Sequence, residues 1–251
     1  MGTLRLILAS LVVLDHTSII GPVYGSIAVK VFFIISGFYM QLLWCKPGLR
    51  VLAFYKSRWL RIVPEYYLFA LLAAVFASPV SASALSVRDW LLTVMLFGRD
   101  FSCYAGHCEL PDFPAWSLAS ELTFYAIAPF ILRMGSLRLA GIAALCLSLY
   151  SVTDAYFFFP ANLGFFLIGA LLYRYDSPLR RFFEATKYIS FDRFIGNLSY
   201  PVYVSHAVLI DICVQHGIYN EGVIIGLIGT VALLTHALVE TPVNSYRKKI
   251  A

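Results

Sequence analysis

The sequence is poor in charged residues. Only 13% of its 251 residues are Asp, Glu, Lys or Arg, whereas a soluble domain carries roughly 25%. A soluble globular protein of this length is disfavoured, because so little charge cannot cover its surface. Hydrophobic residues make up 60% of the chain and the mean hydropathy is +0.79, which indicates an integral membrane protein. The apolar start lacks a small-residue cleavage site and is interrupted by Asp15 and His16, so we interpret it as a retained first span.

Neither the net charge nor the cysteines point to nucleic acid or metal. The formal charge is +5, but basic residues of membrane proteins gather in cytoplasmic loops for reasons of insertion, so no nucleic-acid partner is expected. Cys103 and Cys108 lie close together in a polar stretch and can form a disulfide if that loop faces an oxidising compartment. A metal site that also uses His107 is disfavoured, because two Cys and one His do not complete a ligand set. No metal is predicted.

Eight apolar stretches approach the roughly 20 residues that a helix needs to cross the hydrocarbon layer of a bilayer. A further apolar stretch near 89–98 would reach only about 14 Å as a helix, so we predict that it is re-entrant or interfacial. The sequence therefore predicts an all-α, polytopic membrane helix bundle in a single domain, 1–251. The eight predicted spans are 4–20, 28–44, 59–78, 116–132, 139–152, 156–173, 194–214 and 222–239.

The distribution of Lys and Arg favours this number of spans. With the N-terminus inside, every Lys and Arg except Lys30, Arg88 and Arg99 falls on the cytoplasmic side. Lys and Arg concentrate in cytoplasmic loops, and a ninth span at 89–98 would reverse the orientation of all that follows it. We therefore predict a multi-pass membrane protein with both termini in the cytoplasm.

Ionisable residues inside spans usually face a cavity or a partner, so each is a functional candidate. Arg5 and His16 are eleven positions apart, a net rotation of about 20°, which places them on one helix face. Glu121 in the fourth span is expected about 7 Å below the outer surface and His16 about 6 Å below it. Ser117 shares the helix face of Glu121. The alternative for Glu121 is a structural role, as a helix cap or as the partner of a cation.

Two other clusters carry polar chemistry. Lys56, Arg58 and Arg61 stand at the inner entry to the third span, where guanidinium groups suit bidentate contacts with phosphate. Anchoring to lipid headgroups is the alternative for such a cluster. Tyr203 and His206 are three positions apart in the seventh span, and an intramembrane His is also common as a hydrogen-bonding bridge between helices.

Six segments, in order along the chain, resemble the signature segments of the membrane-bound acyltransferase-3 family. In the first, Arg5 and His16 have ten residues between them. The chain departs from the family in having fewer spans than is usual and in carrying Lys30 where an acidic residue is frequent. The remaining five segments are VKVFFIISGFYM with Ser36, FYKSRWLRIVPEYY with Arg58 and Arg61, PAWSLASELTFYAIAP with Ser117 and Glu121, SYPVYVSHAVLI with Tyr203 and His206, and the closing VETPVNSYRK.

The resemblance implies an O-acyltransferase of the bacterial inner (plasma) membrane. Such a protein moves an acyl group, usually acetyl, from cytoplasmic acyl-CoA to a hydroxyl of a cell-surface glycan or lipid-linked sugar, as in lipopolysaccharide or other polysaccharide biosynthesis. The expected donor is acetyl-CoA or another acyl-CoA, and membrane lipid surrounds the protein. The alternative from another class is a transporter or permease with a polar intramembrane pathway, although no internal repeat supports it.

The chemistry of acyl transfer suggests a role for each candidate. His16 is predicted to be the general base, since the reference pKa of histidine, about 6.5, is close to neutral pH. Glu121 would orient His16 or the acceptor, and a scheme in which His16 itself is acylated first is left open. Arg58 and Arg61 would hold the phosphates of coenzyme A. Arg5 would guide the pantetheine arm. Ser36 would line the path or stabilise the oxyanion. Supporting roles are expected for Ser117, Tyr203 and His206.

Overall fold

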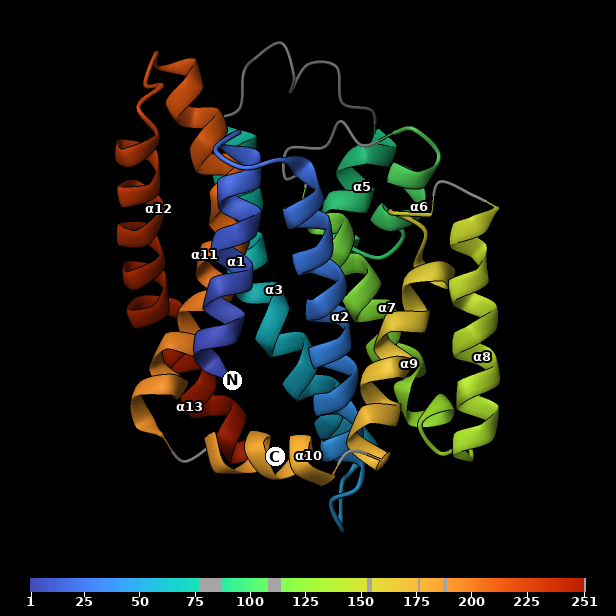
Figure 1. Ribbon diagram of the computed structural model, residues 1–251. Helices are drawn as coiled ribbons and strands as arrows, with labels where there is room; N and C mark the ends of the chain where they lie inside the picture. The colour runs from blue at the N-terminus through green and yellow to red at the C-terminus, as the bar shows by residue number, and fades with distance from the viewer. Residues whose placement is uncertain (77–86, 108–113, 153–154, 176, 187–188, 251) are drawn as a thin grey trace.

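The computed structural model describes residues 1–76, 87–107, 114–152, 155–175, 177–186 and 189–250. The described residues form helices joined by short connections, so the all-α class is confirmed. Figure 1 shows a bundle in which the chain runs repeatedly between two ends. Its elements are α1 (Gly2–His16), α2 (Pro22–Trp44), α3 (Val51–Phe76), α5 (Val87–Met95), α6 (Arg99–Tyr104), α7 (Ala115–Ile131), α8 (Ser136–Ser148), the 3₁₀ turn Leu149–Ser151, α9 (Phe159–Tyr175), α10 (Ser177–Thr186), α11 (Ser190–Gln215), α12 (Glu221–Thr235), the π-helical turn His236–Glu240 and α13 (Thr241–Ile250).

Four helices of the described residues are long and apolar enough to cross a membrane: α2, α3, α11 and the continuous helical segment Glu221–Arg247. Helices α1, α7 and α9 have 15, 17 and 17 residues and run beside them along the bundle (Figure 1). At 1.5 Å per residue they reach about 22 to 26 Å, less than a full hydrocarbon layer. The protein is thus a membrane helix bundle, while the number of eight spans stays a prediction.

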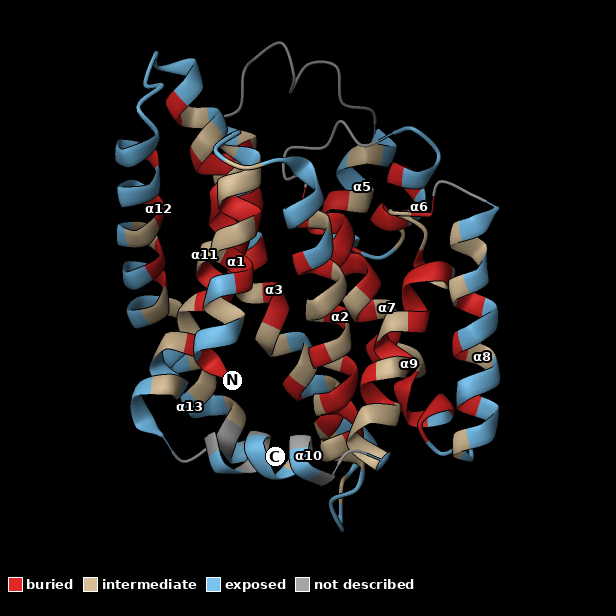
Figure 2. Cartoon of the chain, viewed as in Figure 1, coloured by how far each residue is buried: buried red, intermediate tan, exposed pale blue. Residues whose placement is uncertain are grey.

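The core lies between helices, and the outward faces are apolar. Figure 2 shows buried residues along the inner faces of α1, α2, α7 and α9, and exposed residues along α8 and α12. The exposed positions of the last helical segment include Leu233, Leu234 and Leu238. In water such a surface would be unfavourable, but lipid tails suit it because they are as apolar as leucine.

Glycines let α2 and α9 cross in backbone contact. A Cβ atom at Gly37 would lie 1.8 Å from the carbonyl oxygen of Phe166, and one at Gly169 would lie 1.9 Å from that of Ile34. Small residues at helix crossings allow this approach, which strengthens van der Waals packing in a membrane. The crossing fixes the middle of α2, where Ser36 lies.

The start of α1 is tied to the start of α11 by Asp192. Its carboxylate accepts hydrogen bonds from the backbone N–H groups of Gly2 at 2.8 Å and Thr3 at 2.9 Å, and from the Thr3 hydroxyl at 2.8 Å. The first N–H groups of a helix have no partner within the helix, and the helix dipole favours a negative charge there. This cap holds the first turn of α1, and with it Arg5, in place.

The segment near 89–98 forms a short helix, α5, at one end of the bundle, as an interfacial element would (Figure 1). Behind it, the Arg99 guanidinium donates to the Tyr66 hydroxyl at 2.7 Å, and the Ser120 hydroxyl donates to Asp100 at 3.1 Å. Burial raises the pKa of Asp100 from 3.8 to about 6. These bonds dock α6 against α3 and α7, one residue away from Glu121.

The first span ends earlier than predicted. Helix α1 ends at His16 rather than at residue 20, because Ser18 adopts a left-handed backbone with φ of 62° and the Thr17 hydroxyl bonds the carbonyl of Val13. His16 therefore stands at the helix end and is solvent-exposed instead of lying a full turn inside the span.

Cys103 in α6 is disulfide-bonded, and Cys108 lies outside the described residues.

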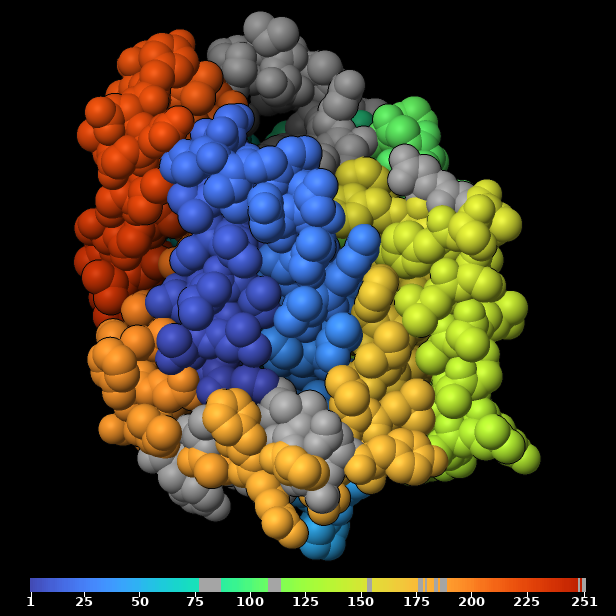
Figure 3. All heavy atoms as spheres, viewed as in Figure 1, coloured from blue at the N-terminus to red at the C-terminus, as the bar shows by residue number. Residues whose placement is uncertain are grey.

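Two amphipathic helices close the end of the bundle where α1 begins. Helix α10 lies across this end below α1 and α9 (Figure 3). Helix α13 ends there too, so both ends of the described chain lie at the same end of the bundle (Figure 1). This agrees with an even number of crossings. The assignment of that end to the cytoplasm remains a prediction.

Candidate active site

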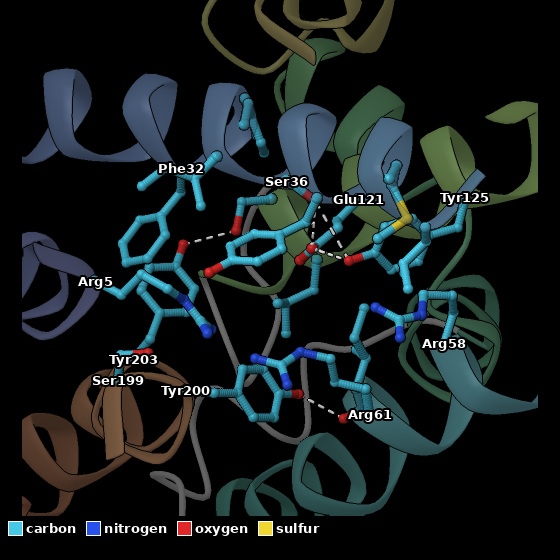
Figure 4. Close-up of a pocket in the computed structure, with 18 of the residues that line it drawn as sticks. Arg5, Phe32, Ser36, Arg58, Arg61, Glu121, Tyr125, Ser199, Tyr200 and Tyr203 are labelled. Carbon is cyan, nitrogen blue, oxygen red and sulfur yellow. Dashed lines mark hydrogen bonds between the residues drawn. The ribbon is translucent and has the colours of Figure 1, made fainter. Parts of the chain in front are cut away.

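A cavity of about 350 Å³ lies between α1, α2, α3, α7, α11 and α13. Cavities of this size are typical of small-molecule sites. Figure 4 shows that its polar side chains point toward one another from different helices. All the site residues predicted from the sequence, apart from His16 and His206, line it: Arg5, Ser36, Arg58, Arg61, Ser117, Glu121 and Tyr203.

Glu121 is held by two hydroxyl groups from two helices. The Ser36 hydroxyl in α2 donates to Glu121 Oε1 at 2.8 Å, and the Tyr125 hydroxyl, one turn further along α7, donates to the same oxygen. Because the Ser36 hydrogen is used in this bond, Ser36 orients Glu121 and lines the cavity. Glu121 Oε2 has no hydrogen-bond partner among the described residues. The carboxylate is thus fixed at one oxygen and available at the other.

The opposite wall of the cavity is strongly basic. Arg5, Lys46, Arg58, Arg61 and Arg247 all line it. Within the described part of the chain, the two ion pairs are Met1 with Asp192 and His236 with Glu240, so none of these five cations has a carboxylate in salt-bridge contact. Lys46 is exposed, but the four arginines are partly buried, and burying a cation costs free energy unless an anion or a set of acceptors compensates it. A set of such cations around one cavity therefore indicates an anionic ligand.

Few neutral groups hold these guanidiniums. Arg58 Nη2 donates to the Ser57 hydroxyl at 3.4 Å and its Cζ atom lies 5.9 Å from the centre of the Tyr125 ring. Arg247 donates to Asn244 at 2.6 Å and reaches Ser57 at 3.5 Å. The Nε atoms of Arg58 and Arg247 are buried without a partner among the described residues. Much of the donor capacity of this cluster is left for a ligand.

Tyr203 separates this cavity from a second one. The Ser117 hydroxyl donates to the carbonyl of Pro114 at 2.9 Å, so the Tyr203 hydroxyl is the donor in its 2.6 Å bond to Ser117. Tyr203 and Val29 line both cavities. The second cavity, of about 310 Å³, contains His16. The two cavities are therefore neighbours with a shared wall.

His16 and His206 form a pair beside that wall. Their rings are 4.9 Å apart in an edge arrangement. Nδ1 of His16 lies 2.8 Å from the carbonyl of Val12, and Nδ1 of His206 lies 2.5 Å from that of Tyr203. A carbonyl only accepts, so in each ring Nδ1 carries the hydrogen and Nε2 of the neutral ring carries the lone pair. His16 thus has the tautomer that a general base needs.

His16 and Glu121, which were predicted to lie close enough for contact, line different cavities. The two residues line neighbouring cavities, with Ser117 and Tyr203 between them. Sequence reasoning also missed Lys46, Arg247, Tyr39 and Tyr200 as lining residues. The i, i+4 spacing of Glu121 and Tyr125 was a usable signal for that pair. Among the described residues, no group of three His, Cys, Asp or Glu side chains is placed to bind a metal ion.

A family model described as an acyltransferase domain, of the acyltransferase-3 type, matches residues 2–191. This chain belongs to the acyltransferase-3 family. Comparisons with curated proteins and with solved structures found no match. The matched range includes the first four of the six recognised segments, which carry Arg5, His16, Ser36, Arg58, Arg61, Ser117 and Glu121. The cavity of this membrane acyltransferase is completed by Tyr200, Tyr203 and Arg247 from beyond that range.

Proposed function

We propose that this acyltransferase moves an acyl group, acetyl in particular, from cytoplasmic acyl-CoA to a hydroxyl of a cell-surface or lipid-linked glycan in the bacterial inner membrane. The observation that carries the donor half is the basic cavity. Acyl-CoA bears several phosphate charges and a long uncharged thioester arm. Five cations without a carboxylate partner among the described residues, next to an apolar wall that includes Phe32, Phe33 and Leu118, match that combination.

In this proposal the five cations act at two depths. Lys46, Arg58, Arg61 and Arg247 come from the part of the bundle where α2 ends and α3 begins, and they hold the phosphates. Arg5 lies on α1, on the same helix as His16, and guides the uncharged arm toward the wall formed by Val29 and Tyr203. The thioester then lies where the two cavities meet.

His16 is the proposed general base. The acceptor hydroxyl enters the second cavity, and its proton passes to Nε2 of His16 while its oxygen forms a bond to the thioester carbon. The carbon–sulfur bond then breaks, and the coenzyme A thiolate takes the proton from the imidazolium. Glu121, fixed by Ser36 and Tyr125, lies on the donor side of Tyr203, where its charge orients the polar groups of the thioester arm.

Two substitutions test the donor half of the proposal. Arg58→Ala is expected to weaken coenzyme A binding about tenfold or more, because a charge-assisted contact contributes roughly 1.5–3 kcal/mol. Arg50→Ala removes the same charge from an exposed position at the same end of the bundle and should leave binding unchanged. Calorimetric titration of the purified protein with coenzyme A measures both. If the two variants bound coenzyme A with equal affinity, the basic cluster would instead be interpreted as an anchor for lipid headgroups.

The base is tested by transfer of labelled acetyl groups. His16→Ala should abolish acetylation of the glycan in cells while the protein remains in the membrane and still binds coenzyme A. His216→Ala, at the exposed end of α11, is the matched control and should retain full transfer. Wild-type transfer by the His16→Ala variant would remove His16 from the mechanism.

A further inference from the structure

The second cavity has a different chemical character from the first. Its volume of about 310 Å³ is enclosed by the end of α1, the start of α2, the start of α7 and the segment before α9. Its polar and aromatic lining consists of Asp15, His16, Ser26, Trp116, Tyr156 and Tyr203. None of the described residues that line it is Lys or Arg, in contrast to the basic cavity on the other side of Tyr203. An anion is therefore not its expected occupant.

The Asp15 side chain fits into this cavity because the neighbouring residue on α2, Gly25, has no side chain. A Cβ atom at Gly25 would lie 2.0 Å from Oδ2 of Asp15 and 2.8 Å from its carboxyl carbon, so the carboxylate rests against bare backbone of α2. Among the described residues, the Asp15 side chain makes no hydrogen bond or ion pair. An ionised carboxylate can only accept hydrogen bonds. The cavity thus offers a fixed acceptor to a ligand that brings donors.

Aromatic rings form the other walls. Trp116 packs on Tyr156 with ring centres 4.8 Å apart, and both line the cavity. A phenol has an ordinary pKa of about 10, so the Tyr156 hydroxyl is protonated and can donate a hydrogen bond at neutral pH. His16, at the end of α1, contributes the lone pair of Nε2 described above. Flat apolar faces are thereby combined with acceptors for hydroxyl groups.

We propose that this second cavity is the binding site for the acceptor sugar, with Asp15 as the residue that grips its ring. In this arrangement Asp15 accepts hydrogen bonds from ring hydroxyls that do not react, Trp116 and Tyr156 cover an apolar ring face, and another hydroxyl meets His16. This assignment rests on the proposed function, and it adds the carbohydrate specificity to it. A monohydric alcohol has no second hydroxyl for Asp15, so Asp15 favours polyhydroxy acceptors.

Binding is measured separately from catalysis by saturation-transfer difference NMR, with methyl glucoside and methyl galactoside as the probes. The full-length protein is held in lipid nanodiscs, because maltoside detergents themselves carry sugar. Wild-type protein should transfer saturation to at least one glycoside, and Asp15→Asn should lose most of that signal. Gly25→Ala should reproduce the loss, because the new methyl group displaces the carboxylate. Gly21→Ala, where a Cβ atom meets nothing within 4 Å, should behave as wild type.

The outcomes separate this assignment from the proposed function. No saturation transfer to either glycoside, an Asp15→Asn signal equal to that of wild type, or a stronger signal for choline than for the glycosides would overturn the sugar site. Titration of the same samples with coenzyme A tests the proposed donor independently. All three variants should bind coenzyme A with wild-type affinity. A wild-type protein that binds glycosides but not coenzyme A would contradict the proposed donor while leaving the sugar site in place.

Discussion

Gly37→Ala is expected to reduce acyl transfer sharply without touching a substrate. A Cβ atom at this position would lie 1.8 Å from the Phe166 carbonyl oxygen, whereas ordinary contacts begin at 3.4 Å. The difference, about 1.6 Å, has to be absorbed by moving α2 away from α9, because backbone lies on both sides of the contact. Ser36 precedes Gly37 and holds Glu121 through a 2.8 Å hydrogen bond, which does not survive a shift of that size. A misplacement of about 1 Å in an active site can cost about 10²-fold in rate.

The same substitution should also destabilise the fold, by roughly 1–3 kcal/mol, as overpacking in a core does. Acyl transfer is best followed with labelled acetyl-CoA, since Cys45 is an exposed thiol that would react with a thiol reagent. Thermal unfolding in the same detergent gives the stability. Gly226→Ala in α12, where the new methyl group meets nothing within 4 Å, is the control; it should leave transfer unchanged and should not lower stability, since Ala is the better helix former. A Gly37→Ala variant with wild-type transfer and wild-type unfolding would refute the packing argument.

Three further predictions concern charged groups outside the two cavities. Asp192→Ala removes the cap of α1 and should lower stability by about 0.5–2 kcal/mol in thermal unfolding, whereas Asp192→Asn should lose less. Because the pKa of Asp100 is raised from 3.8 to about 6, ionisation costs the fold up to about 3 kcal/mol. Asp100→Asn should therefore raise the unfolding midpoint at about pH 8 and change it little at about pH 4, and the reverse order would contradict the burial argument. Glu240→Gln should lower the KM for acetyl-CoA with little change in kcat, because it removes a negative charge beside Arg61 and Arg247, the proposed phosphate ligands; exposed Leu238→Ala is its control, and a raised KM would contradict this reasoning.

Much of the fold could be predicted from apolar runs, because lipid demands continuous hydrophobic helices. The predicted spans 28–44 and 116–132 correspond closely to α2 and α7. Helices α10 and α13 were not predicted, since both are amphipathic and carry charges that a search for apolar runs passes over. The end of α1 was placed too late, because hydropathy cannot detect the left-handed turn at Ser18.

The sequence predicted most of the residues that form the site, but it predicted fewer of the contacts between them. Helix spacing is enough to place Arg5 and His16 on one face, or Glu121 one turn from Tyr125, because such relations lie within one helix. The bond from Ser36 to Glu121 joins two helices and depends on how closely α2 packs against its neighbours. Arg247 reaches the cavity from α13, the amphipathic helix that follows the π-helical turn His236–Glu240 and that was not predicted.

The contrast between the two cavities determines which substrate each one is expected to bind in the proposed reaction. A polyanionic donor is attracted by the arginines on one side of Tyr203 and meets Asp15 and aromatic rings on the other, where its charge would be repelled. A neutral polyol has the opposite preference, because it gains little from unpaired guanidiniums and much from a fixed carboxylate beside Trp116. The thioester arm and its acyl group carry no charge, so in this proposal they can reach the shared wall at little electrostatic cost. His16 lines the second cavity, on the acceptor side of that wall, so the proposed general base would contact the hydroxyl before the thioester.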